Sequence, residues 1–290
     1  MNKLLAITSG LLAAGVANAE FTMPAFNINS KIAFETAHVS EGRRTMDQNF
    51  APSIEIGLPL FGAGDLYVGL DAYLMANSQK EGRNEFDPYV GFSYDVTDMF
   101  TLDLGYTYKR FDSKYELTGY TDVAGAAGKV IEGKKYSHEI YAGVMADVLL
   151  NPSIYFSYDL TQKKADIEGA LGYTLDLGSF GAKGLAIDLG AKAGYSRVTK
   201  PFGIKRSTTA VLATAAAGTA PTALSGTYFA KKGWFYGALS ADLVYGFNDN
   251  AKARAGVAFS FNNAKKDSWI NSMNAKKHNV WFSSAVEFAF

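Results

Sequence analysis

Apolar and polar side chains alternate over many segments of this chain, each about ten residues long. In the segment 165–177, Ile167 and Leu171 alternate with Asp166 and Glu168. Side chains at every second position of a strand share one face, so the pattern predicts strands with one apolar and one charged face. Charges at every second position do not fit the core of a soluble sheet. We therefore expect an apolar outer wall around a wet interior.

Beyond residue 19, no segment approaches the roughly 20 consecutive apolar residues that a membrane-spanning helix needs. The mean hydropathy of −0.03 is near neutral, as expected when lipid-facing and lumen-facing residues alternate. A closed barrel is the other structure that satisfies every backbone polar group in lipid. The sequence thus predicts an all-β transmembrane protein.

The N-terminus has the layout of a secretory signal peptide. Lys3 supplies a positive charge, residues 4–16 are apolar, and small residues at positions 17 and 19 form a cleavage site. A membrane anchor is the alternative, but the apolar run is too short to span a bilayer. We expect residues 1–19 to be a signal peptide and residues 20–290 to form one outer-membrane β-barrel domain, exported through the periplasm of a Gram-negative bacterium.

Together, the alternating segments predict an antiparallel up-and-down β-barrel of about twelve strands. The expected strands span residues 26–39, 50–58, 65–76, 86–96, 99–110, 135–149, 152–162, 165–177, 185–198, 232–246, 251–262 and 278–290.

The connections between these strands alternate in length. Three are tight turns, at 96–98, 150–152 and 247–250, and they contain turn-forming residues. Outer-membrane barrels have short periplasmic turns and long outer loops, so both termini should lie in the periplasm. The connections expected on the outside are long and polar, with the short link 161–164 as an exception: 40–49, 77–85, 111–134, 199–231 and 263–277.

Aromatic residues gather near the ends of the expected strands, which fits two interfacial girdles. Tyr108, Tyr195 and Trp234 would belong to the outer girdle. The final strand alternates and ends on Phe290, which resembles the C-terminal signature of outer-membrane barrels. We therefore predict that Phe290 is an insertion signal read by the barrel-assembly machinery.

Several blocks of the chain resemble a family of outer-membrane porins known as TorF. They include the segments 91–95, 102–108, 139–144 and 150–155, and the resemblance covers residues 86–178. It implies a passive channel at most and carries no site residues to this chain.

Carboxylates dominate the positions expected to face the lumen, and rings of carboxylates favour cations. We predict a porin-like channel for passive diffusion of small hydrophilic solutes, mildly cation-preferring. The alternative is a non-conducting structural or surface-binding barrel whose paired charges fill the lumen. The predicted lumen-lining residues are Lys31, Glu55, Asp71, Asp95, Asp103, Glu139, Asp159, Glu168, Asp176, Asp188, Lys192, Asp242, Lys252, Arg254 and Glu287.

The lumen cations are not spread evenly. Lys31, Lys252 and Arg254 fall on strands that meet at the closing seam, whereas carboxylates dominate the third to the ninth strand. Two interpretations stay open at this point. The basic residues either face the acidic wall across an open lumen and create a transverse field, or they pair with carboxylates in salt bridges.

A third hypothesis is an outer-membrane lipid-acting hydrolase. The chain has His38, His138 and His278, and the first and last of these lie on neighbouring strands once the barrel closes. Ser137 and Glu139 flank His138, but adjacent strand residues point to opposite faces and form no triad. No nucleophile, nucleotide or metal motif is present, and the chain has no cysteine. We expect no enzyme activity, no cofactor and no metal.

The outer loops suggest further partners. The segment 207–226 is uncharged and would be either a flexible surface loop or a segment folded into the barrel mouth. Lysine and arginine residues, including Arg206 and Lys265, would make the outer rim basic, either as solvated charge or as contacts to lipopolysaccharide phosphates. A formal net charge of zero gives no electrostatic reason to expect nucleic acid. The oligomeric state stays open.

Overall fold

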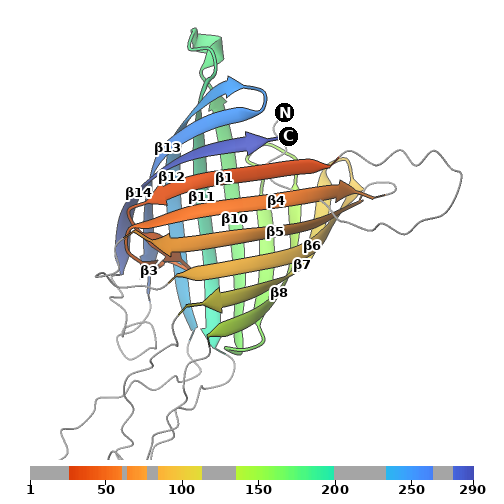
Figure 1. Ribbon diagram of the computed structural model, residues 1–290, viewed down its shortest axis with the longest axis vertical. Helices are drawn as coiled ribbons and strands as arrows, with labels where there is room; N and C mark the ends of the chain where they lie inside the picture. Colours follow the sequence, from red (N-terminus) through yellow and green to blue (C-terminus); the bar gives the residue numbers. More distant parts are fainter. Residues whose placement is uncertain (1–25, 61–63, 77–83, 113–134, 199–232, 264–276) are drawn as a thin grey trace, which may run out of the picture.

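A computed structural model describes residues 26–60, 64–76, 84–112, 135–198, 233–263 and 277–290. In these ranges twelve strands form a closed antiparallel barrel, which confirms the predicted fold class (Figure 1). Its strands are β1 (Asn27–Glu35), β4 (Asn49–Pro59), β5 (Gly64–Met75), β6 (Glu85–Thr97), β7 (Phe100–Phe111), β8 (Tyr136–Ala146), β9 (Ser153–Asp159), β10 (Lys164–Asp176), β11 (Leu185–Val198), β12 (Gly233–Asn248), β13 (Ala251–Asn262) and β14 (His278–Ala289).

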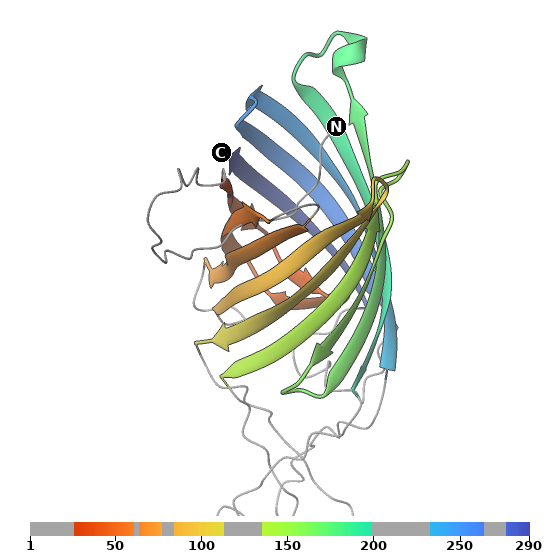
Figure 2. The ribbon, with the colours of Figure 1, turned by 90° about the vertical axis from the view of Figure 1, so that its right-hand side faces the viewer.

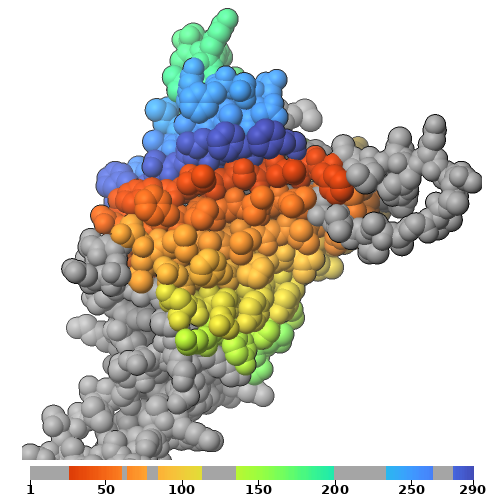
Figure 3. All heavy atoms as spheres, in the orientation of Figure 1, coloured from red at the N-terminus to blue at the C-terminus, as the bar shows by residue number. Residues whose placement is uncertain are grey.

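Each barrel strand pairs with the next one in the chain, and β1 pairs with β14 to close the ring. At this seam Ile32 lies opposite Val286, and Lys31 lies opposite Glu287. Figure 3 shows the first strand (red) directly beside the last (blue) on a continuous surface. The barrel therefore has no free edge, and its strands satisfy one another's backbone groups.

The two faces of the wall differ in chemistry. Outward side chains are large, apolar and exposed; Ile32 is 62% exposed and Phe282 is 60% exposed. Inward side chains are polar or aromatic, and Tyr67, Asp103 and Tyr236 are buried. This is the alternation that the sequence pattern predicts. Among the described residues, no helix is both long and apolar enough to cross a membrane.

The described ends of the chain lie at one end of the barrel, where Phe290 and Ile28 exchange backbone hydrogen bonds of 2.8 and 2.9 Å. Tight turns occupy this end, including the connection from β8 to β9, where Leu150 and Asn151 have positive φ angles. The predicted signal peptide, the segment 207–226 and the rim residues Arg206 and Lys265 lie outside the described residues.

One expectation was wrong. The predicted first strand, 26–39, ends at Glu35, and the segment 40–49 is not a loop outside the barrel. Instead β2 (His38–Ser40) and β3 (Arg43–Met46) form a separate two-stranded sheet. This hairpin lies within the ring of strands, toward the end away from the termini (Figures 1 and 2). Its polar tip finds hydrogen-bond partners on the inner wall, which explains why it turns inward.

Trp234 also departs from expectation. The sequence suggests a place in the outer aromatic girdle, but the residue points inward and is only 3% exposed. Its indole Nε1 donates a hydrogen bond of 3.4 Å to the backbone carbonyl of Glu41 in the hairpin. Trp234 is thus part of the surface on which the hairpin docks.

Candidate functional site in the barrel interior

Tyrosine rings on the inner face of β5–β9 lie over glycines on the neighbouring strands. Tyr67 is directly opposite Gly91, and Tyr141 is directly opposite Gly105. A Cβ atom at Gly91 would lie 2.1 Å from Cζ of Tyr67, and one at Gly105 would lie 2.3 Å from Cζ of Tyr141. Only glycine leaves room for a ring that lies flat against the wall.

The hydroxyl groups of these tyrosines hold carboxylates. Tyr67 donates to Oδ1 of Asp103 at 2.5 Å, and Tyr155 donates to Oδ2 of the same carboxylate at 2.9 Å. Tyr89 donates to Oε2 of Glu55 at 2.8 Å. These neutral donors satisfy the carboxylates without cancelling their charge. We call this region, Tyr67, Tyr89, Tyr141 and Tyr155 with Glu55 and Asp103, the tyrosine wall.

The opposite side of the interior holds its carboxylates with cations. The guanidinium of Arg254 lies 2.9 Å from Asp188, 3.6 Å from Asp242 and 3.3 Å from Glu287. Lys252 adds a second cation at 2.8 Å from Glu287. We call these five residues the arginine wall. The partners come from β11, β12 and β14, close to the basic residues themselves. The structure thus favours local salt bridges over an uncompensated basic wall.

The tip of the hairpin is anchored through a backbone carbonyl. Gly42, at φ +72°, presents its carbonyl to the side-chain amides of Asn262 and Asn279, at 2.8 and 3.2 Å. A Cβ at this position would lie 2.6 Å from the carbonyl oxygen of Phe261. Both the left-handed backbone and the close approach require glycine.

Charges anchor the same tip. The Glu41 carboxylate forms ion pairs with Lys164 of β10 and, at 2.8 Å, with Arg43. Burial alone would raise the pKa of the Glu41 carboxyl, but Lys164 and Arg43 outweigh this effect and hold the pKa well below its ordinary value. The Arg43 guanidinium lies 4.9 Å from the ring centre of Trp234, within cation–π range. The hairpin is therefore held in a defined position.

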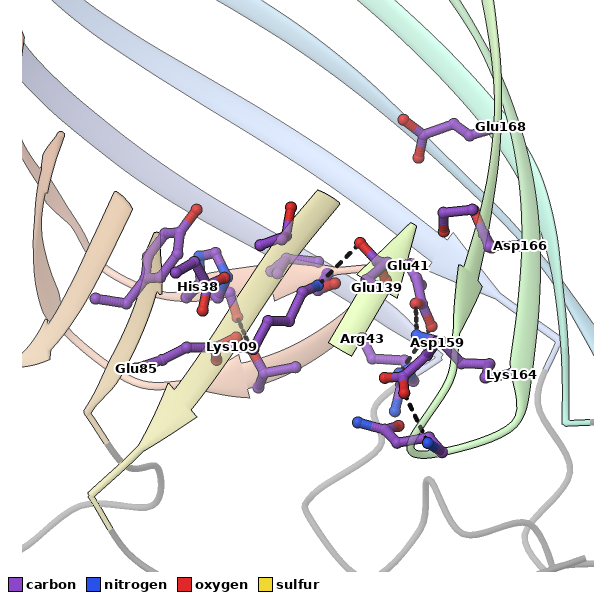
Figure 4. Close-up of a pocket in the computed structure, with 18 of the residues that line it drawn as sticks. His38, Glu41, Arg43, Glu85, Lys109, Glu139, Asp159, Lys164, Asp166 and Glu168 are labelled. Atoms are coloured by element: carbon purple, nitrogen blue, oxygen red, sulfur yellow. Dashed lines mark hydrogen bonds and ion pairs between the residues drawn. The ribbon is translucent and has the colours of Figure 1, made fainter. Parts of the chain in front are cut away.

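A cavity of about 600 Å³ lies between the docked hairpin and the wall formed by β5–β12. Figure 4 shows charged side chains from both sides pointing into it. Every lysine and arginine that lines this cavity forms an ion pair with a carboxylate: Arg43 and Lys164 with Glu41, Lys109 with Glu139, and Lys192 with Glu168. Four further lining carboxylates, Glu85, Asp87, Asp159 and Asp166, give the cavity a negative excess.

The predicted lumen residues fall into five groups. Glu55 and Asp103 belong to the tyrosine wall, and Asp188, Asp242, Lys252, Arg254 and Glu287 form the arginine wall. Glu139, Asp159, Glu168 and Lys192 line the cavity. Lys31 and Asp71 face inward near the seam, each directly opposite Ser53. Asp95 and Asp176 lie at the turn end, where they accept hydrogen bonds from Thr101 and from the backbone of Gly178.

Sequence reasoning missed the contributions of the hairpin and of the tyrosines. The sequence pattern places Glu41, Gly42 and Arg43 in an outer loop, whereas the structure places them inside the barrel. Tyr67 and Tyr155 were not recognised as carboxylate ligands. One signal was available: a tyrosine on the polar register of one strand, with a glycine at the matching place of the next, predicts a ring lying against the lumen wall.

The three histidines lie apart. His38 is in the hairpin, 3.3 Å from Glu35, with its ring 3.9 Å from that of Tyr73. His138 contacts the rings of Tyr106 and Tyr108, and His278 stacks on Phe259. In the described part of the chain, no three histidine, cysteine or acidic side chains are placed to hold a metal ion.

No protein-family model and no curated protein matches the sequence. Among solved structures, the KdgM porin has a TM-score of 0.45 and 12% sequence identity, over 91% of this chain and 99% of that one. The NanC porin has a TM-score of 0.46 and 9% sequence identity, over 90% of this chain and 98% of that one. The COG4313 outer membrane channel from Pseudomonas putida F1 has a TM-score of 0.48 and 8% sequence identity, over 97% of this chain and 100% of that one. These likenesses concern the barrel fold alone, and the TorF resemblance stays a prediction.

Proposed function

We propose that this protein is an outer-membrane channel for the passive diffusion of small hydrophilic solutes. The observation that carries the proposal is the polar cavity of about 600 Å³ left beside a hairpin docked inside the barrel. A channel for small hydrophilic solutes needs a polar path of limited width, and this cavity is polar and narrow. The hairpin is then the constriction that sets the size of the solutes.

The channel prefers cations mildly. The lysines and arginines at the cavity are each paired with carboxylates, and the remaining carboxylates leave an excess of negative charge. Such an excess raises the local concentration of cations in a narrow aqueous path. The preference should weaken with salt, because the Debye length falls from about 10 Å at 0.1 M to about 3 Å at 1 M.

The outer membrane is the compartment that fits an apolar outer wall on a closed barrel. The signal peptide at 1–19, the role of Phe290 in insertion, and contacts with lipopolysaccharide and the barrel-assembly machinery remain predictions. Phe290 itself is 68% exposed and stacks on Phe288.

Single-channel recording in a planar bilayer tests the proposal. The purified protein should conduct in KCl, and a salt gradient should give a reversal potential on the cation side. Replacing both Asn262 and Asn279 by Ala removes the donors to the Gly42 carbonyl. The hairpin should then leave its docked position more often, and conductance should rise and become noisier. Asn248→Ala, at the turn end, should leave conductance unchanged.

Three outcomes would contradict parts of the proposal. Absence of conductance at every salt concentration, for the parent and the double variant alike, would favour the non-conducting structural barrel. A clear anion preference would show that the carboxylate excess does not govern the path. An unchanged current in the double variant would remove the hairpin's role as the constriction.

A further inference from the structure

We infer that the cavity beside the hairpin is a binding site for small organic diamines, and that such dications are a preferred solute class of the channel. This inference rests on the proposed function and narrows it. It depends on three observations: the surplus of carboxylates, one buried carboxylate oxygen without a partner, and the aromatic rings among the lining residues.

The carboxylates left over from the ion pairs are not equivalent. Asp159 accepts hydrogen bonds from the Ser137 hydroxyl at 2.5 Å and from the backbone amides of Thr161 and Gln162. Asp166 accepts bonds from the hydroxyls of Ser196 and Tyr236. All these donors are neutral, so they fix both carboxylates in position without cancelling their negative charge.

Asp87 differs from them. It lines the cavity, is only 8% exposed, and its Oδ1 has no hydrogen-bond partner among the described residues. A buried carboxylate oxygen without a donor is costly, so it marks a place where a donor is missing. Glu85 lies two residues earlier on the same inner face, also lines the cavity, and shares a side-chain hydrogen bond with Asp87, so the two carboxyl groups hold a proton between them. A protonated amine, with three donors, satisfies such a group.

Aromatic side chains complete the lining. Tyr73 is directly opposite Glu85 on the neighbouring strand, and both line the cavity. Tyr141, Tyr155 and Tyr236 line it farther along. Ring faces attract ammonium groups, and their apolar surface covers methylene groups. A simple metal cation would use only the carboxylates, whereas an alkylammonium ion uses both.

The acidic groups lie at two sides of the cavity. In Figure 4, Glu85 lies near Lys109 and His38 on one side, whereas Asp159 and Asp166 lie beside Lys164 on the other. A ligand with a positive charge at each end and an apolar middle therefore matches the arrangement better than one with a single charge.

Isothermal titration calorimetry on the folded, detergent-solubilised barrel tests the site with 1,4-diaminobutane as the probe. Binding should be saturable. Butylamine, with one ammonium group, should bind about tenfold more weakly, because one charged hydrogen bond is lost. 1,4-Butanediol, which has the same length but no charge, should give no saturable heat.

Variants locate the site. Asp87→Asn and Glu85→Gln should each weaken diamine binding about tenfold, since each removes one charged contact. Asp95→Asn is the matched control, because this carboxylate lies at the turn end and accepts a bond from Thr101. It should leave affinity unchanged. Testing two separate variants guards against one that fails to fold, and heat-modifiability on gels identifies folded protein.

Single-channel current recording with 1,4-diaminobutane dihydrochloride on one side and KCl on the other separates the inference from the proposed function. Permeation and a concentration-dependent block of the K⁺ current support the inference. Conductance without diamine binding overturns the inference and leaves the channel intact. Diamine binding without conductance in any salt overturns the channel and leaves the site. Equal binding of the diamine and the diol overturns the site as a charge-recognition site.

Discussion

The tyrosine wall and the arginine wall solve the same physical problem differently. Both hold carboxylates on the inner face of a barrel, away from bulk water. In the tyrosine wall the donors are neutral hydroxyls, as in the bonds of Asp103 with Tyr67 and Tyr155. In the arginine wall the donors are cations, and Arg254 alone serves three carboxylates.

The two walls differ in whether the hydrogen-bond donors also neutralise the carboxylates. A hydroxyl donor stabilises a carboxylate and keeps the negative charge, whereas a guanidinium stabilises it and removes most of the field. The tyrosine wall therefore keeps the net charge of the interior negative. The arginine wall mainly stabilises the barrel by linking β11, β12, β13 and β14. The neutral solution also needs space, because each ring must lie over a glycine.

The close approach of the tyrosine rings to the glycines gives the largest expected effect on folding free energy. In a Gly91→Val variant the new side chain would displace the Tyr67 ring, whose Cζ lies 2.1 Å from the Cβ position. Overpacking and a lost bond to Asp103 should cost about 3 kcal/mol of folding free energy. Denaturant unfolding in detergent measures this. Gly172→Ala is the control, because a Cβ there meets nothing within 4 Å. Equal costs for the two variants would contradict the proposed packing.

Removing Arg254 should affect stability less than Gly91→Val does, but it should clearly affect the current. An Arg254→Met variant leaves Asp188, Asp242 and Glu287 without their shared guanidinium. We expect a loss of about 2 kcal/mol, because part of the repulsion is screened in a wet lumen. The reversal potential should shift further toward cations. Lys252→Met should shift it less, since the Lys252 side chain is 43% exposed. A shift toward anions would break the assignment of the two walls.

The smallest effect should come from a neutral donor. Tyr67→Phe removes one hydroxyl and no charge, and Tyr155 still donates to Asp103. Stability should fall by about 1.5 kcal/mol, because the bond to Asp103 and the bond with the Tyr141 hydroxyl are both lost. The reversal potential should stay at the parent value, in contrast to Arg254→Met. Tyr173→Phe, on the outer face, serves as the control for stability. A changed selectivity in Tyr67→Phe would show that hydroxyls contribute to charge selection.

The strands and their closure followed from the sequence because they depend on a local signal. Alternation fixes which side chains share a face, and turn residues fix where a strand ends. The end of β13 at Asn262 and the start of β11 at Leu185 agree with expectation for this reason. Alternation alone does not tell which donor a carboxylate meets. That Asp103 bonds to tyrosines and Asp188 to Arg254 depends on the stagger of strands separated in the barrel.

The hairpin was not predictable in the same way. Its segment is short, polar and charged, which are properties of an ordinary outer loop. It turns inward because Asn262, Asn279 and Trp234 offer donors at the right place on distant strands. No local pattern in residues 38–46 carries that information.

These anchors also have a kinetic meaning. The bonds from Asn262 and Asn279 to Gly42 join residues 220 and 237 positions apart, and the Glu41–Lys164 pair joins residues 123 positions apart. Contacts of such separation form late, since the intervening chain must first be ordered. The hairpin lies near the N-terminus of the chain. Its docking surface is complete only when β13 and β14 have joined the wall. Its docking is thus coupled to the completion of the barrel, and a truncated or mispaired wall would leave the hairpin without its docked position.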